Sequence, residues 1–167
     1  MPIFFGVTAM LVRIVRRLTL NEIEERMRSF ETEYGMTFDD FEEMLIRKGE
    51  RVDPVSVEAY LRWADLVHAY RRYFEDGEID CIVEEIMDLS PEEMGIFTPK
   101  RLELLYQLSA LKVASINDLA HKVRRNVKNV YQDLKILHDY GFISFRKRGK
   151  KNKVPENLVE EIAFLIG

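Results

Sequence analysis

The sequence predicts a mainly α-helical protein with one short β-hairpin near its C-terminal end. Three observations support this fold class. Helix-capping patterns followed by apolar residues at three- and four-residue spacing recur along the chain. A short alternating segment that continues into Gly149 and Asn152 indicates a hairpin. Hydrophobic residues make up 47% of the 167 residues, which is enough for a core and argues against global disorder.

Charge divides the chain into two halves. The first 97 residues contain eleven Lys and Arg against 22 Asp and Glu, whereas the remaining residues contain fourteen against seven. The resulting charges of −11 and +7 add to the net −4 of the chain. Opposite charge indicates separate tasks. We therefore expect an acidic helical region over residues 1–89 and a second domain over residues 90–167.

The acidic half is expected to form helices. They begin at the capping residues Thr19, Thr37 and Asp53 and end near Gly35, Gly49 and Gly77. Residues 78–88 predict a further helix. The third helix has a wide apolar face, for which core packing is the favoured interpretation and a helix shared with a second subunit the alternative. Acidic residues alternate with these core positions and predict a solvated face.

The opening 15 residues are apolar but shorter than the ~20 residues that a membrane span needs. Arginines follow this stretch, whereas a signal peptide carries its positive charge before the apolar run. Residues 11–15 (LVRIV) predict a β-like segment packed on the body of the protein. The single cysteine, Cys81, excludes an internal disulfide and is expected to be buried. We expect a cytoplasmic protein without membrane association.

Three short helices are expected in the basic half. Thr98-Pro99 caps the first, Ser115–Asp118 is a capping box that opens the second, and Asn126 caps a third that spans 126–140. A basic hairpin over 144–154 follows. Three helices and then a hairpin is the order of a winged helix-turn-helix, in which the third helix enters the major groove of DNA. The final segment, after residue 156, predicts either a helix or a strand.

Residues 121–153 concentrate positive charge. They contain eleven Lys and Arg, opposed only by Asp133 and Asp139, so this stretch carries +9. A phosphate backbone is the partner best matched to such an excess, and Lys, Asn and Gln on the outer helix face suit base edges. The expected DNA-binding residues are Ser115, Lys122, Arg124, Arg125, Lys128, Asn129, Tyr131, Gln132, Lys135, Arg146, Lys147, Arg148, Lys150, Lys151 and Lys153.

Four motifs carry a family resemblance: FTPKRLELL at 97–105, SINDLA at 115–120, KNVYQDLKIL at 128–137 and GFI at 141–143. Through them, residues 90–155 resemble archaeal-type transcriptional regulators of the MarR/ArsR-like winged-helix class, some of whose relatives are antitoxin-like. The resemblance implies a winged helix-turn-helix that regulates transcription. Arg124 departs from the pattern, because a Gly or a small residue is expected in that turn.

Known catalytic and metal-binding motifs are missing from the sequence. The three histidines lack ligand spacing, and there is no phosphate-binding Gly-rich loop and no nucleophile elbow. We therefore expect no enzyme activity, no cofactor and no metal. The expected partners are double-stranded DNA and a second copy of the chain, with the acidic half as a dimer surface or a protein-binding site. The alternatives are a protein-interaction module (an antitoxin-like protein or a transcription-apparatus adaptor) and, with less support, a binder of structured RNA.

Overall fold

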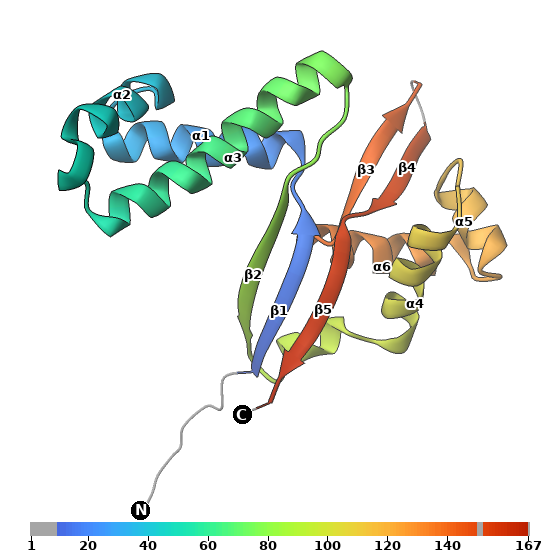
Figure 1. Cartoon of the computed structure of the whole chain (residues 1–167). Coiled ribbons are helices and arrows are strands. Elements are labelled where there is room, and N and C mark those ends of the chain that lie inside the picture. The colour runs from blue at the N-terminus through green and yellow to red at the C-terminus, as the bar shows by residue number, and fades with distance from the viewer. Residues whose placement is uncertain (1–9, 150–151, 167) are drawn as a thin grey trace, which may run out of the picture. The chain divides into compact units, whose positions relative to one another are not determined.

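The computed structural model describes residues 10–149 and 152–166, and it leaves the side chains of Arg148 and Asn152 undescribed. Within these residues the chain forms six α-helices, two short 3₁₀ helices and five strands (Figure 1). The chain divides into two compact units. One contains Leu18–Ile82, and the other contains the described residues before Leu18 together with the described residues from Val83 onward. We call them the helical unit and the mixed unit.

The helical unit contains three helices. Its elements are α1 (Leu20–Tyr34), α2 (Phe38–Lys48), η1 (Gly49–Arg51) and α3 (Pro54–Asp76). The expected caps are confirmed, since the side chains of Thr19, Thr37 and Asp53 accept hydrogen bonds from first-turn amides. Helices α1 and α3 run side by side (Figure 1). An aromatic core forms around Trp63, which is fully buried and stacks on Phe30 at a centroid distance of 5.3 Å.

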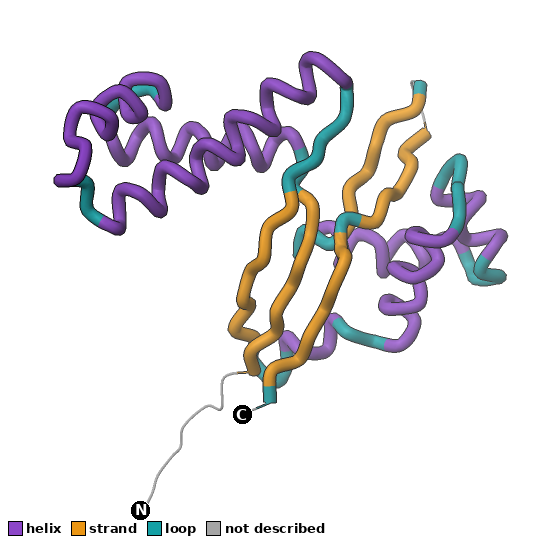
Figure 2. The backbone as a smooth tube through the Cα atoms, in the orientation of Figure 1, coloured by secondary structure: helices purple, strands orange, loops and turns teal. Residues whose placement is uncertain are grey.

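The mixed unit contains two antiparallel sheets and three helices. Its elements are β1 (Met10–Arg17), β2 (Ile82–Leu89), η2 (Glu93–Ile96), α4 (Pro99–Ala110), α5 (Ile116–Lys122), α6 (Val127–Asp139), β3 (Ile143–Arg148), β4 (Asn152–Asn157) and β5 (Val159–Leu165). The strand order of the larger sheet is β2-β1-β5, and β3 pairs with β4 in a hairpin. Figure 2 shows this hairpin apart from the larger sheet, although β4 continues almost directly into β5.

Helices α4, α5 and α6 pack on one face of the larger sheet (Figure 1). The core between them contains Val12 and Ile14 of β1, Leu104 of α4, Leu119 of α5 and Leu134 of α6, each no more than 1% exposed. The apolar positions of α4 and α6 recur at three- and four-residue spacing, so each helix buries one stripe. The opposite stripe of α6 is thereby left facing solvent.

The structure overturns one expectation for the ends of the two halves, resolves an open alternative and confirms a third expectation. Residues 78–88 do not form a helix, because Ile82–Leu89 is strand β2. Its β-branched residues suit a strand, and β1 supplies a pairing partner that local spacing cannot reveal. The final segment is a strand, β5, which pairs with β1 from Leu11↔Leu165 to Arg16↔Val159. The β-like segment expected at residues 11–15 is confirmed as part of β1.

The boundary expected between residues 89 and 90 differs from the observed division. Strands β1 and β2 belong to the mixed unit, so only Leu18–Ile82 forms the separate helical unit. The composition of residues 10–17 does not indicate that they pair with strands far along the chain. Among the described residues, none of the helices combines the length and apolar character needed to cross a membrane. The chain is mainly helical, as expected, but with more β-structure than the single hairpin predicted from sequence.

Candidate nucleic-acid interface

Helix α6 separates apolar from polar side chains sharply. Val130, Leu134 and Leu137 are at most 1% exposed, and they anchor the helix in the core. The opposite side contains exposed basic, amide and phenol groups. These are Lys128, Asn129, Tyr131, Gln132 and Lys135. Lys128 and Lys135 lie seven residues apart, which is about 10 Å along the axis. One exposed row can therefore follow a groove of nucleic acid for about two helical turns.

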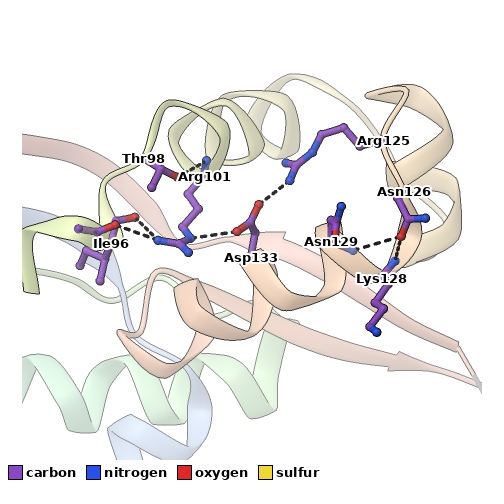
Figure 3. Close-up of polar contacts among 9 residues, drawn as sticks. Ile96, Thr98, Arg101, Arg125, Asn126, Lys128, Asn129 and Asp133 are labelled. Atoms are coloured by element: carbon purple, nitrogen blue, oxygen red, sulfur yellow. Dashed lines mark hydrogen bonds and ion pairs between the residues drawn. The ribbon is translucent and has the colours of Figure 1, made fainter.

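The start of α6 is fixed by its own cap. The Asn126 Oδ1 atom accepts hydrogen bonds from the backbone N–H groups of Lys128 at 2.8 Å and Asn129 at 3.4 Å (Figure 3). These bonds satisfy two of the amides that a helix leaves without partners at its N-terminus. The Lys128 side chain points away from the network around Asp133 (Figure 3). The cap was expected from the sequence and is confirmed.

The hairpin presents a second set of cations. β3 and β4 pair in register from Ile143↔Asn157 to Arg148↔Asn152. Arg146, Lys147 and Lys153 are exposed, and Arg146 forms an ion pair with Glu156 at 3.2 Å. The predicted residues Lys150 and Lys151, at the tip, lie outside the described residues, as does the side chain of Arg148.

The end of α6 contacts the hairpin through an aromatic pair. The rings of His138 and Phe145 lie 5.1 Å apart between centroids, and the Lys153 Nζ atom lies 5.8 Å from the Phe145 ring. Because Tyr131, Lys135 and His138 follow each other at helical spacing, the exposed row of α6 leads directly to this contact. We call the exposed row of α6 together with Lys147 and Lys153 the basic surface. Arg146 precedes Lys147 on β3, so it projects from the other face of the hairpin.

Two lysines of the hairpin directly oppose each other. Lys147 pairs with Lys153 in the β3–β4 register, so the two side chains project from the same face. Like charges in opposed cross-strand positions destabilise a sheet. An anion that binds between them would remove this repulsion. The pair can therefore bind an anion.

A buried carboxylate ties the helices together. Asp133 of α6 accepts a hydrogen bond from the Arg101 Nε atom of α4 at 3.0 Å and one from the Arg125 Nη2 atom at 2.5 Å (Figure 3). The three side chains are only 15–18% exposed. Arg101 also donates to the backbone oxygens of Gly95 and Ile96 at 2.9 and 3.5 Å. This network joins the turn before α4, α4 itself and the turn before α6.

The turn between α5 and α6 has an unusual backbone. Arg124 has a φ of +56°, and it is the one non-glycine residue with positive φ among the described residues. The left-handed conformation explains why a Gly is expected there, since it strains any residue with a Cβ atom. The Arg124 side chain is exposed. Arg124 therefore adopts the backbone conformation expected of a Gly in this turn, and it adds a cation beside α6.

Two of the predicted DNA-binding residues stabilise the start of α5. The Ser115 hydroxyl accepts the Asp118 N–H group as the helix cap. The Lys122 Nζ atom donates to Lys112 O at 2.7 Å and to Asp118 Oδ2 at 3.1 Å. The hydrogen bond from the Ala114 N–H group, followed by the one from Lys122, lowers the pKa of Asp118 below its ordinary value. Both residues thus have structural partners in this region.

The structure brings most of the predicted residues into one unit but gives them different surroundings. The basic surface is formed by Lys128, Asn129, Tyr131, Gln132, Lys135, Lys147 and Lys153, whereas Arg146 is exposed on the other face of the hairpin. Arg124 is exposed beside it, whereas Arg125 turns toward Asp133 and is 15% exposed. Sequence reasoning missed the roles of Arg101, Asp133 and His138. The signal available for Asp133 was its position as one of only two acids in the strongly basic segment 121–153.

Groups of His, Cys, Asp and Glu that could hold a metal ion are not found among residues 10–149 and 152–166. Cys81 is buried, as expected, and burial raises the pKa of its thiol.

Comparison with known protein families places part of the chain beside one of them. A family model described as HVO_A0114 matches residues 96–161, which extend from the end of η2 into β5. This segment, similar to that family, contains all three helices and the hairpin of the mixed unit. Neither the curated proteins nor the solved structures provide a match to the chain.

Proposed function

We propose that this protein is a transcriptional regulator that binds double-stranded DNA through a winged helix-turn-helix. In this proposal α6 lies in the major groove, and the β3–β4 hairpin contacts the adjacent phosphates as the wing. Asn129 and Gln132 read base edges, while the lysines and arginines bind the backbone. Two copies read a pseudo-palindromic site, so the paired contacts multiply a modest single-copy affinity.

The continuity of the basic surface carries this proposal. A helix that exposes Lys, Asn and Gln while burying Val130, Leu134 and Leu137 on its other side is suited to a groove rather than to a protein core. The His138–Phe145 contact joins that helix to a hairpin whose cations continue the same charge. The opposed Lys147 and Lys153 repel each other, and a bound anion would relieve this repulsion.

The direct test is a gel shift of the gene's own upstream DNA across a salt series. We expect a linear fall of log affinity with log salt, at a slope of about −0.9 for each phosphate contacted. Duplex RNA of the same sequence serves as competitor, and we expect it to compete poorly because α6 cannot enter the deep, narrow major groove of A-form RNA. Binding to neither nucleic acid at low salt would rule the proposal out.

Replacing Asn129 or Gln132 by Ala should erode discrimination between DNA sites more than it lowers overall affinity. A good bidentate amide–adenine contact contributes roughly 1–3 kcal/mol of discrimination against the wrong base. We therefore expect the preference for the best site over random DNA to fall about tenfold or more, while the salt slope stays unchanged. Selection of binding sites from a random library by each variant measures this. An equal loss on all sequences would assign these residues to the backbone instead.

Replacing Lys147 by Glu should stabilise the hairpin and weaken DNA binding at the same time. The substitution turns an opposed Lys–Lys pair into an opposite-charge pair with Lys153, which is worth roughly 0.2–1 kcal/mol in a sheet. DNA affinity should fall, because a negative charge replaces a phosphate contact. Hydrogen exchange of the β3 and β4 amides and the gel shift measure the two effects. A fall in both stability and affinity would contradict the like-charge argument.

A further inference from the structure

Strand β5 forms an open edge of the three-stranded sheet. The edge of a sheet presents backbone N–H and C=O groups that can pair with another strand, and proteins protect such edges with Lys, Pro or short length. β5 contains neither Lys nor Pro. Its last part is apolar and solvent-exposed, with Phe164 at 46% and Leu165 at 41%. Leu11, which lies opposite Leu165 on β1, is 37% exposed.

The beginning of β5 is closed to further pairing. A register shift between Val15 and Arg16 places a bulge there, since their β5 partners are Glu161 and Val159. The Asn157 side chain also occupies both backbone groups of Val159: its Nδ2 atom donates to the carbonyl at 2.8 Å and its Oδ1 atom accepts from the N–H at 3.0 Å. The part of the edge that can accept a strand is therefore Glu161–Leu165.

A groove lies along the same edge. It encloses about 1130 Å³ and is lined by β5 from Val159 to Phe164, by the return strand of the hairpin and by α4. Leu102, Leu105 and Tyr106 of α4 form an apolar wall, and Tyr106 is 75% exposed. An open strand edge beside an apolar wall is suited to an added β-strand.

We propose that the occupant is β5 of a second copy, paired antiparallel about a two-fold axis at Ala163. Ile162 then faces Phe164 of the partner subunit, Glu161 faces Leu165 of the partner subunit, and the two alanines face each other. Each directly opposed pair consists of two apolar residues or of one apolar residue and one acid, so no two like charges lie opposite each other. Parallel pairing in register would instead place Glu161 beside Glu161 of the partner subunit, which is unfavourable.

The charge on this edge also favours a second copy over a basic peptide. The Glu161 carboxylate is already paired with Arg13 of its own chain, at 2.6 Å from Nη2. Glu156, which lines the groove, is paired with Arg146. Glu156 and Glu161 are thus neutralised within the chain, and the exposed Glu160 lies at the register shift, outside the segment Glu161–Leu165. What remains is the apolar pattern of Ile162, Ala163 and Phe164, which is complementary to itself.

This dimer deepens the proposed function, because a two-fold pair of mixed units would present two α6 helices to a pseudo-palindromic site. The biological role of the dimer rests on the proposed function, whereas the argument for the dimer surface does not. The sheet edge, rather than the acidic helices expected from sequence, becomes the dimer surface.

The test measures molar mass by light scattering across a concentration series, without DNA. We expect wild type to exceed the 19.7 kDa monomer and approach twice that mass. Ala163→Glu should raise the dimer dissociation constant roughly 100-fold, because two like charges meet at the axis. Within its own chain the new carboxylate lies opposite Arg13, so the fold is kept. Ala163→Lys should also dissociate the dimer, and an equimolar mixture of the two variants should restore it.

Two further arms identify the surface. Ile86→Glu places a charge on β2, at the opposite edge, and should leave the mass unchanged. Ala163→Cys in a Cys81→Ser background should form a disulfide across the axis, since directly opposed residues lie within disulfide range. A monomeric wild type overturns the proposal. So does a dimer whose dissociation constant is unchanged by Ala163→Glu and whose Ala163→Cys variant forms no cross-link. A monomer that binds DNA, or a dimer that does not, separates this inference from the proposed function.

Discussion

Simultaneous replacement of five hairpin cations by Ala should reduce DNA affinity by about 10²- to 10⁴-fold at low salt. The five residues are Arg146, Lys147, Arg148, Lys150 and Lys151. Each lost phosphate contact should flatten the salt slope by about 0.9, so the slope changes by roughly four if most of the five contact phosphates. The loss should be similar for every DNA sequence, because phosphates carry no base information. Gel shifts or fluorescence anisotropy on specific and random duplexes measure both quantities.

The matched control removes five exposed cations from the helical unit. These are Arg47, Lys48, Arg62, Arg71 and Arg72. The control changes net charge by the same amount, so it separates a local contact from a general electrostatic effect. We expect the control to retain nearly the full affinity and the full salt slope. The wing assignment fails if the two variants lose affinity equally, or if the hairpin variant binds as tightly as wild type at every salt concentration.

Local chemistry explains why helix ends were predicted well. The caps at Thr19, Thr98 and Asn126 act within four residues of themselves, so their signals are complete in the sequence. The same applies to Gly77, whose left-handed φ of +76° ends α3. The hairpin also followed from local signals, through alternation and its turn residues.

Strands β2 and β5 could not be predicted from the local sequence alone. Both segments have apolar spacing that suits a helix as well as a strand, and the choice depends on pairing with β1, which lies over 60 residues away. The same limit applies to the candidate site. Arg125 is one more cation in the sequence, but Asp133 and the turn at Arg124 direct it inward. The exposed row of α6 was predictable because helical spacing alone determines it.

Asp133→Ala should lower the stability of the mixed unit by roughly 2–4 kcal/mol, somewhat less than for a fully buried pair because its side chains are slightly exposed. The substitution leaves two guanidinium groups, Arg101 and Arg125, buried without the carboxylate that binds both. Hydrogen exchange of the α4 and α6 amides is the appropriate measurement, because Trp63 fluorescence reports on the helical unit. Asp139→Ala, on the same helix and exposed, is the control and should cost less than about 0.5 kcal/mol.

A triple variant distinguishes a structural network from a DNA contact. Arg101→Met, Asp133→Leu and Arg125→Met together replace the buried charges by apolar groups, and such replacements are often neutral or stabilising. If Arg125 serves only to hold α6, the triple variant should recover both stability and DNA affinity relative to Asp133→Ala. If Arg125 contacts phosphate, as the sequence predicted, stability should recover while affinity stays low and the salt slope falls by about 0.9. Because Arg125 is turned toward Asp133 and mostly buried, we expect the first result. If the single variants Asp133→Ala and Asp139→Ala were equally stable, the network around Asp133 would not be what holds α6 in place.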